Sequence, residues 1–84
     1  MIRILYFAQF RERLNCESEE FQTKTESLTV KSLMQQLAER GEPWTDVFNS
    51  KQRILVAINQ EMSNLEADIK DNDEVAFFPP ITGG

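Results

Sequence analysis

The fold is decided by one stretch, Leu28-Thr29-Val30-Lys31-Ser32-Leu33-Met34-Gln35-Gln36-Leu37-Ala38-Glu39-Arg40-Gly41. Its apolar residues recur at helical spacing and form a single stripe, made of Val30, Leu33, Met34, Leu37 and Ala38. Thr29 is a good N-cap, and Leu28 before it is placed to pack on Leu33 as a hydrophobic staple. Gly41 is predicted to close the helix as its C′ residue, with Pro43 two residues later. This stretch predicts the main helix.

Two strand patterns lie at the ends of the chain. Residues 1–7 alternate, and three of them share the face that we expect to meet the core: Ile2, Ile4 and Tyr6. Residues 74–78 form the last predicted strand, with Val75 and Phe77 on one face and Phe78 on the other. The turn before it is predicted at residues 71–73, because Asn and Asp cap their own backbone and tolerate left-handed φ.

Shorter patterns fill the space between. Residues 8–15 suit a short helix, and residues 17–23 suit a polar strand at a sheet edge. A further helical turn is predicted around Trp44, Val47 and Phe48. The apolar run within residues 53–59 indicates a central strand covered on both faces. A turn is predicted at residues 60–61, and brief pairing at residues 62–65.

Strands at both ends with one main helix between them predict an α+β fold, the β-grasp or ubiquitin-like arrangement. A mixed sheet would pack on the main helix, with the first and last strands side by side in its middle. We expect one β-grasp domain over residues 1–78 and a protruding tail over residues 79–84.

Composition excludes several classes of function. The 84 residues make one small domain, and a net charge of −5 argues against nucleic acid or an anionic membrane as a partner. The chain has no histidine and a single cysteine, so we expect no metal site and no independent hydrolytic catalysis. Asp71, Asp73 and Glu74 are too few and too close for an EF-hand loop. Cys16 fits a reducing, cytoplasmic compartment, and no apolar run approaches a membrane span.

The sequence ends with Pro79-Pro80-Ile81-Thr82-Gly83-Gly84, and two of the three glycines are its last residues. The prolines end the strand and stiffen the start of the tail, which reaches at most roughly 20 Å. Terminal glycines leave a slim carboxylate that can enter a narrow channel and be activated as an acyl-adenylate. The alternative is a frayed end without function.

A docking surface for a partner is predicted beside this tail. Phe78 lies on the face opposite Phe77, and we expect it to form an exposed apolar patch with Phe7, Leu5 and Met62. The alternative is that some of these residues belong to the ordinary core. We expect the partner to be a protein with a basic or mixed surface.

The chain resembles a known family, the small sulfur-carrier subunit of molybdopterin synthase. The resemblance spans nearly the whole chain and is strongest over residues 1–12, 56–60 and 73–84. One departure is visible in the last turn, where the family usually reads Asp-Gly-Asp and this chain has Asn72 in the glycine position. Asn accepts the same backbone region.

The resemblance implies a role for the terminus. Gly84 would be adenylated by an E1-like activating enzyme that uses ATP and Mg, and a sulfur donor protein would then supply a thiocarboxylate. The tail residues Pro79, Pro80, Ile81, Thr82 and Gly83 would insert into the large catalytic subunit, in a two-plus-two heterotetramer. Sulfur would pass to cyclic pyranopterin monophosphate and form the dithiolene of molybdopterin. The chain alone would bind no cofactor, and Cys16 would be a bystander.

Three other functions stay open. The first is the sulfur carrier of thiamine thiazole synthesis, although such chains are usually shorter and lack the Phe-Phe-Pro-Pro lead-in. The second is a ubiquitin-like modifier, which would leave adducts on the lysines of many proteins. The third is a non-catalytic binding module, whose function would survive removal of Gly84.

Overall fold

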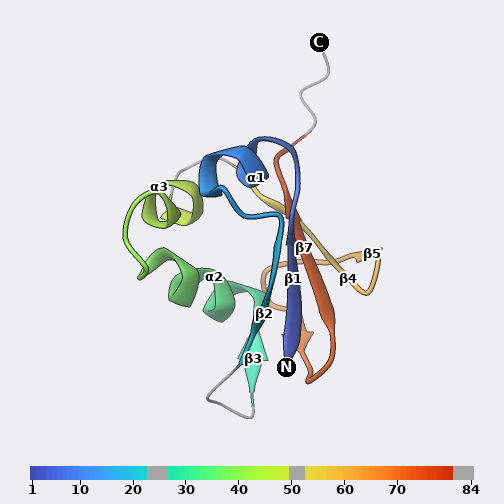
Figure 1. Cartoon of the computed structure of the whole chain (residues 1–84). Coiled ribbons are helices and arrows are strands. Elements are labelled where there is room, and N and C mark those ends of the chain that lie inside the picture. The colour runs from blue at the N-terminus through green and yellow to red at the C-terminus, as the bar shows by residue number, and fades with distance from the viewer. Residues whose placement is uncertain (23–26, 50–52, 81–84) are drawn as a thin grey trace.

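The computed structural model describes residues 1–22, 27–49 and 53–80, and its centre is a mixed five-stranded sheet (Figure 1). The strand order is β2-β1-β7-β4-β5. The strands are β1 Ile2–Tyr6, β2 Ser18–Phe21, β4 Leu55–Ile58, β5 Glu61–Met62 and β7 Glu74–Phe78. Strand β1 pairs in parallel with β7, and the other neighbours are antiparallel. The two end strands therefore lie side by side inside the sheet, and the β-grasp fold is confirmed.

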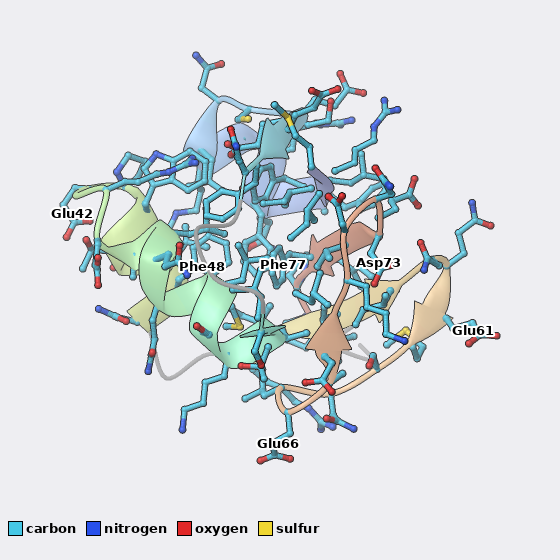
Figure 2. All side chains as sticks on the ribbon, turned by 90° about the horizontal axis from the view of Figure 1, so that it is seen from below. Glu42, Phe48, Glu61, Glu66, Asp73 and Phe77 are labelled. Atoms are coloured by element: carbon cyan, nitrogen blue, oxygen red, sulfur yellow. The ribbon has the colours of Figure 1, made fainter. Side chains whose placement is uncertain are left out.

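Three helices lie on one face of this sheet: α1 Ala8–Leu14, α2 Val30–Ala38 and α3 Trp44–Asn49 (Figure 1). The core forms between them and the inward side chains of the strands. Figure 2 places Phe48 and Phe77 in this interior, while the acidic Glu42, Glu61 and Glu66 lie at the periphery. The predicted inward set of β1, Ile2, Ile4 and Tyr6, is buried. No helix of the described residues is long and apolar enough to cross a membrane.

Helix α2 begins as predicted and ends earlier than predicted. The Thr29 hydroxyl accepts a hydrogen bond from the Ser32 N–H at 3.1 Å, which satisfies one of the unpaired donors of the first turn. The C-cap is Glu39, so the prediction of Gly41 as C′ was wrong. The last turn tightens because the Arg40 N–H bonds to the Leu37 carbonyl, and Gly41 takes its positive φ of 93° one residue later than C′.

Strand β4 departs from the prediction of a strand covered on both faces. The helices cover only the face that contains Val56, and the other face of the sheet carries no helix (Figure 1). Ala57 is buried on that open face because it is small and flanked by neighbouring strands, whereas Leu55 stays half-buried. The continuous apolar run was therefore wrongly interpreted as two covered faces.

A small second sheet was missed by the sequence analysis. It pairs β3 Leu28–Thr29 with β6 Asp68–Ile69, so that Leu28 faces Ile69 in register. Two-residue strands have no measurable periodicity, which explains the omission. The hairpin turn between β4 and β5 lies at Asn59 and Gln60, one residue before the prediction, because both residues adopt the positive φ of a tight hairpin.

The predicted turn at residues 71–73 is confirmed. Asn72 has a φ of 72°, the left-handed region that glycine usually occupies. The Asp73 carboxylate accepts from the Lys70 N–H at 2.8 Å and from the Asn59 side-chain amide at 3.0 Å. The Asn59 side-chain oxygen also accepts from the Glu74 N–H at 3.0 Å, so the two turns at this end of the sheet support each other.

Replacing Thr29 by alanine tests the N-cap. We expect Thr29→Ala to lower the free energy of unfolding by about 1 kcal/mol, because the Ser32 N–H loses its acceptor. Urea unfolding followed by circular dichroism measures this change. Thr29→Ser keeps the hydroxyl and should retain most of the stability. Equal losses in the two variants would contradict the capping role.

Candidate docking face and tail root

The open face of the sheet carries the apolar residues that the sequence predicted as a docking patch. Register places Leu5 beside Ala76, Ala76 beside Ala57, and Ala57 beside Met62, in one row across four strands. Met62 at the end of this row is 62% exposed. Ala76 and Ala57, in the middle of this row, have small side chains. Leu5 and Met62 therefore lie on either side of a shallow apolar depression.

A second row lies at the end of the sheet where β7 finishes. Phe7 and Phe78 meet edge to face, with ring centroids 6.2 Å apart. Leu55 lies beside Phe78 in the β4–β7 register. Phe7 is 44% exposed, whereas Phe78 and Leu55 are half-buried. Phe78 is therefore less exposed than predicted, because Phe7 and Leu55 flank it on both sides.

The structure thus brings the predicted residues onto one face. We define the outer patch as Leu5, Phe7, Leu55, Met62 and Phe78. Leu55 was missed as a surface residue, because its apolar run was interpreted as fully buried. Its even spacing from Ala57 was the available signal, since residues two apart in a strand share a face. The docking role of this patch stays a prediction.

The tail starts beside this patch, and we call its first two residues, Pro79 and Pro80, the tail root. Strand β7 ends at Phe78, and the half-buried Pro79 and Pro80 follow it. The Phe7 N–H donates to the Phe77 carbonyl at 3.1 Å, which ties the residue after β1 to the end of β7, just before the prolines. The predicted tail residues Ile81, Thr82, Gly83 and Gly84 lie outside the described residues.

A polar cluster fixes the end of β1 that carries Phe7. The Tyr6 hydroxyl donates to the Glu19 carboxylate at 2.8 Å, and Arg40 binds the same carboxylate through two hydrogen bonds of 2.8 and 2.9 Å. The Arg40 guanidinium also lies 4.5 Å from the centre of the Trp44 ring. The cluster therefore joins β1, β2, α3 and the segment just after α2.

The arrangement of this cluster shifts the pKa values of the three ionisable groups in it. Burial raises the pKa of Tyr6, and its hydrogen bond to Glu19 raises that pKa further. Burial alone would raise the pKa of Glu19, but hydrogen bonds from Arg40 and Tyr6 outweigh it and lower the pKa. The hydrogen bond to Glu19 raises the pKa of Arg40. A lowered Glu19 pKa and a raised Arg40 pKa keep both groups charged near neutral pH, where they form an ion pair.

Cys16 lies near this cluster and apart from the outer patch. Its thiol donates to the Ser18 carbonyl at 3.5 Å, and burial raises the pKa of the thiol. A raised pKa disfavours the reactive thiolate form. This environment agrees with the interpretation of Cys16 as a bystander, which stays a prediction. Among the described residues, no group of three or more Cys, Asp or Glu side chains could hold a metal ion.

Comparisons with known proteins come from family, sequence and structure. Residues 4–84 match the ThiS family. The chain is 39% identical over 84 residues to the molybdopterin synthase sulfur carrier subunit of Haemophilus influenzae, covering 100% of both chains.

Two solved structures resemble the fold. One is described as a putative molybdopterin converting factor, subunit 1, from Pyrococcus furiosus, with a TM-score of 0.77 and 23% identity, covering 95% of this chain and 97% of that one. The other is a chain from the complex of subunits 1 and 2 of molybdopterin-converting factor from Helicobacter pylori. It has a TM-score of 0.62 and 24% identity, covering 99% of this chain and 97% of that one. At these identities the likeness shows a shared β-grasp fold.

The polar cluster predicts a pH dependence of stability. The pKa of Glu19 is lowered in the folded state, so its contribution is present above the unfolded pKa and is lost as pH falls through the folded pKa. Near neutral pH, we expect Glu19→Gln to reduce the free energy of unfolding by about 1 kcal/mol, because Arg40 loses a charged acceptor at a partly exposed position.

The measurement is urea unfolding of both proteins at several pH values. The difference between wild type and Glu19→Gln should shrink as pH falls below 4.5, the ordinary pKa of the group. Glu20→Gln is the matched control, because Glu20 is an exposed neighbour on the same strand. If both variants show the same pH dependence, the cluster does not carry the effect.

Proposed function

The chain belongs to the ThiS family, and we propose that it is the sulfur carrier subunit of molybdopterin synthase. The observation that carries the proposal is the match to the Haemophilus influenzae sulfur carrier subunit, at 39% identity over the full length of both chains. The geometry supports it independently. A stiff tail root leaves the domain beside an open apolar face, which is the arrangement that a docked carrier with an inserted terminus needs.

The working group in this proposal is the α-carboxylate of Gly84. A carboxylate is a poor electrophile, so it first attacks the α-phosphate of ATP on an E1-like activating enzyme and releases pyrophosphate. A persulfide of a sulfur donor protein then attacks the carbonyl carbon and displaces AMP, and reductive cleavage of the S–S bond by a thiol leaves a thiocarboxylate. Gly83 and Gly84 suit both steps because neither carries a side chain that would block the nucleophile.

The acceptor step takes place on the large subunit of the synthase. The sulfur of the thiocarboxylate bonds to a side-chain carbon of cyclic pyranopterin monophosphate, while the C–O bond at that carbon breaks and its oxygen leaves as water or stays with the phosphate. Hydrolysis of the resulting thioester returns the Gly84 carboxylate and leaves the sulfur on the carbon. Two such transfers give the dithiolene of molybdopterin. Residues 79–84 are Pro, Pro, Ile, Thr, Gly and Gly, whose side chains do not ionise near neutral pH, so we assign the acid-base chemistry to the large subunit.

Docking on the outer patch would bring the tail to the active site. Phe7 and Phe78 lie at the end of the sheet from which the prolines leave, so a partner that covers them also receives the tail. Pro79 and Pro80 fix two φ angles and reduce the conformational entropy lost when the tail inserts. The Helicobacter pylori complex of subunits 1 and 2 supports a partner of this kind, since one of its chains shares the fold.

Intact mass spectrometry tests the carrier chemistry. After incubation with ATP, Mg, the activating enzyme and a sulfur source, we expect a mass gain that corresponds to one oxygen replaced by sulfur. A variant that lacks Gly84 should show no gain. Adding the large subunit and cyclic pyranopterin monophosphate should then return the mass to its starting value.

Other results would favour the alternative functions. A charged chain that the large subunit does not discharge would fit a carrier for another acceptor, such as the thiazole of thiamine. Adducts on lysines of other proteins would fit a ubiquitin-like modifier. No charging, under conditions that charge a known carrier, would refute the proposal.

Substitution on the outer patch tests the docking face. We expect Phe7→Ser to weaken binding of the large subunit at least about tenfold, because an exposed aromatic anchor of the interface is lost. The fold should tolerate this change, since Phe7 is the N-cap of α1 and serine is favoured there. Isothermal titration calorimetry gives the affinity.

Leu65→Ser is the matched control. Leu65 is 42% exposed, close to the 44% of Phe7, but it does not belong to the outer patch. Its substitution should leave the affinity for the large subunit unchanged. If the two substitutions weaken binding equally, the partner does not dock through the outer patch.

A further inference from the structure

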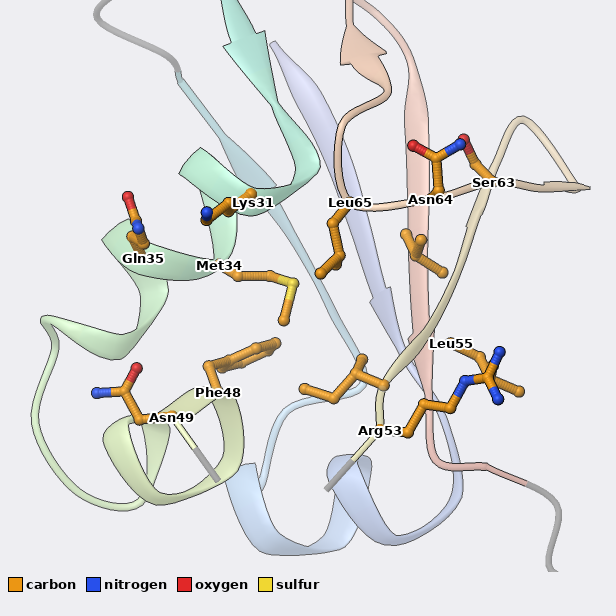
Figure 3. A pocket seen from close by; sticks show the side chains of 12 residues that line it. Lys31, Met34, Gln35, Phe48, Asn49, Arg53, Leu55, Ser63, Asn64 and Leu65 are labelled. Carbon is orange, nitrogen blue, oxygen red and sulfur yellow. The ribbon is translucent and has the colours of Figure 1, made fainter. Parts of the chain in front are cut away.

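A second apolar surface lies on the helix side of the sheet, in a groove of about 500 Å³ between α2, α3, β4 and residues 63–65 (Figure 3). Its floor contains Met34 from α2, Phe48 from α3 and Leu65 from the segment after β5. Leu65 is one of the few large apolar side chains that the fold leaves exposed. A volume of this size lies in the range of binding pockets.

One wall of the groove is an open strand edge. Strand β5 pairs only with Ala57 and Ile58, and the Ser63 N–H donates to the Val56 carbonyl at 3.0 Å. In the part of the chain that the structure describes, no strand lies beside β4 before Val56 on this side. The Arg53 and Leu55 side chains extend away from Met34 in Figure 3, so these residues line the groove mainly through their main chain.

The charge of the groove differs from that of the whole protein. The chain carries a net charge of −5, yet none of the twelve residues that line the groove is acidic. Lys31 lies on the α2 rim, and no ion pair joins it to a carboxylate of the described residues. The groove therefore favours an apolar ligand with negative charge at the Lys31 side.

We propose that this groove binds an extended peptide segment of a partner protein, with apolar side chains flanked by acidic residues. The segment would pair its main chain with that of Ile54, just before β4, as in β-strand addition. Its apolar side chains would cover Met34, Phe48 and Leu65, and a carboxylate would pair with Lys31. A peptide fits better than a compact small molecule because the main chain of Ile54 faces this edge beyond the hydrogen bond between Ser63 and Val56, beside the apolar side chains of the groove.

This binding site is separate from the outer patch. The groove opens on the helix side of the sheet, whereas Phe7 and Phe78 lie on the side without helices. A segment in the groove would leave the outer patch and the tail root uncovered. The proposal therefore does not depend on the sulfur carrier function.

The probe is a synthetic peptide, acetyl-Asp-Glu-Ile-Val-Leu-Glu-Asp-amide, titrated into the isotopically labelled full chain and followed by amide NMR shifts. We expect the largest shifts at Ile54, Val56 and Leu65. Two control peptides separate the contributions: one has lysine at every acidic position, and one has serine and glycine in place of the apolar residues. Both should bind at least about tenfold more weakly.

Two exposed substitutions test the groove without disturbing the core. Leu65→Ser should weaken the acidic peptide several-fold, and Lys31→Glu should reverse the preference between the acidic and lysine-flanked peptides. Phe7→Ser on the opposite face should change neither affinity. Unchanged circular dichroism of each variant would show that the fold is intact.

Three results would overturn the proposal. The first is no shift at the groove at millimolar peptide, and the second is a set of shifts confined to the outer patch. The third is binding of a small aromatic anion, anilinonaphthalene sulfonate, in the groove while the peptide does not bind. That last result would assign the groove to a small molecule.

Discussion

The parallel pairing of β1 with β7 is the constraint on which the rest of the structure depends. It joins Ile4 to Val75 and Tyr6 to Phe77, residues about seventy positions apart. Closing so long a loop costs entropy, and burial of these four side chains offsets it. The pairing also matters for the function that we propose, because parallel strands finish at the same end of the sheet. Phe7 and the start of the tail therefore lie together at that end, although they are far apart in the sequence.

Placing all three helices on one side gives the sheet two different faces. The inner face is closed by the core, and the outer face keeps a row of apolar side chains open to solvent. Ala57 and Ala76 make that face flat, which suits contact with another protein more than enclosure of a small molecule. An exposed apolar face carries a risk of self-association, and the net charge of −5 opposes it. The same separation leaves the groove beside Leu65 free to bind a different ligand.

Local chemistry made the main helix, the end strands and the last turn predictable. Thr29 caps its helix and Asn72 takes its left-handed turn because both effects act within a few residues. The errors have a different origin. An apolar run such as residues 54–58 does not say how many faces of a strand are covered, and β3 and β6 exist only because Leu28 meets Ile69 in space. The groove could not be predicted from the sequence either, because it forms only where helix α2 lies beside the segment after β5.

The position of Phe77 explains how a small domain can present a terminus. Its ring is fully buried and stacks near Tyr6 at 6.3 Å and edge-on to Phe48 at 5.3 Å. Tyr6 is held in turn by Glu19 of β2, which binds Arg40 just after α2, so the anchor of the tail extends beyond the two central strands. Pro79 follows this anchor after one residue. The tail therefore starts from a fixed point and in a restricted direction, which would reduce the entropy lost on the insertion that we propose.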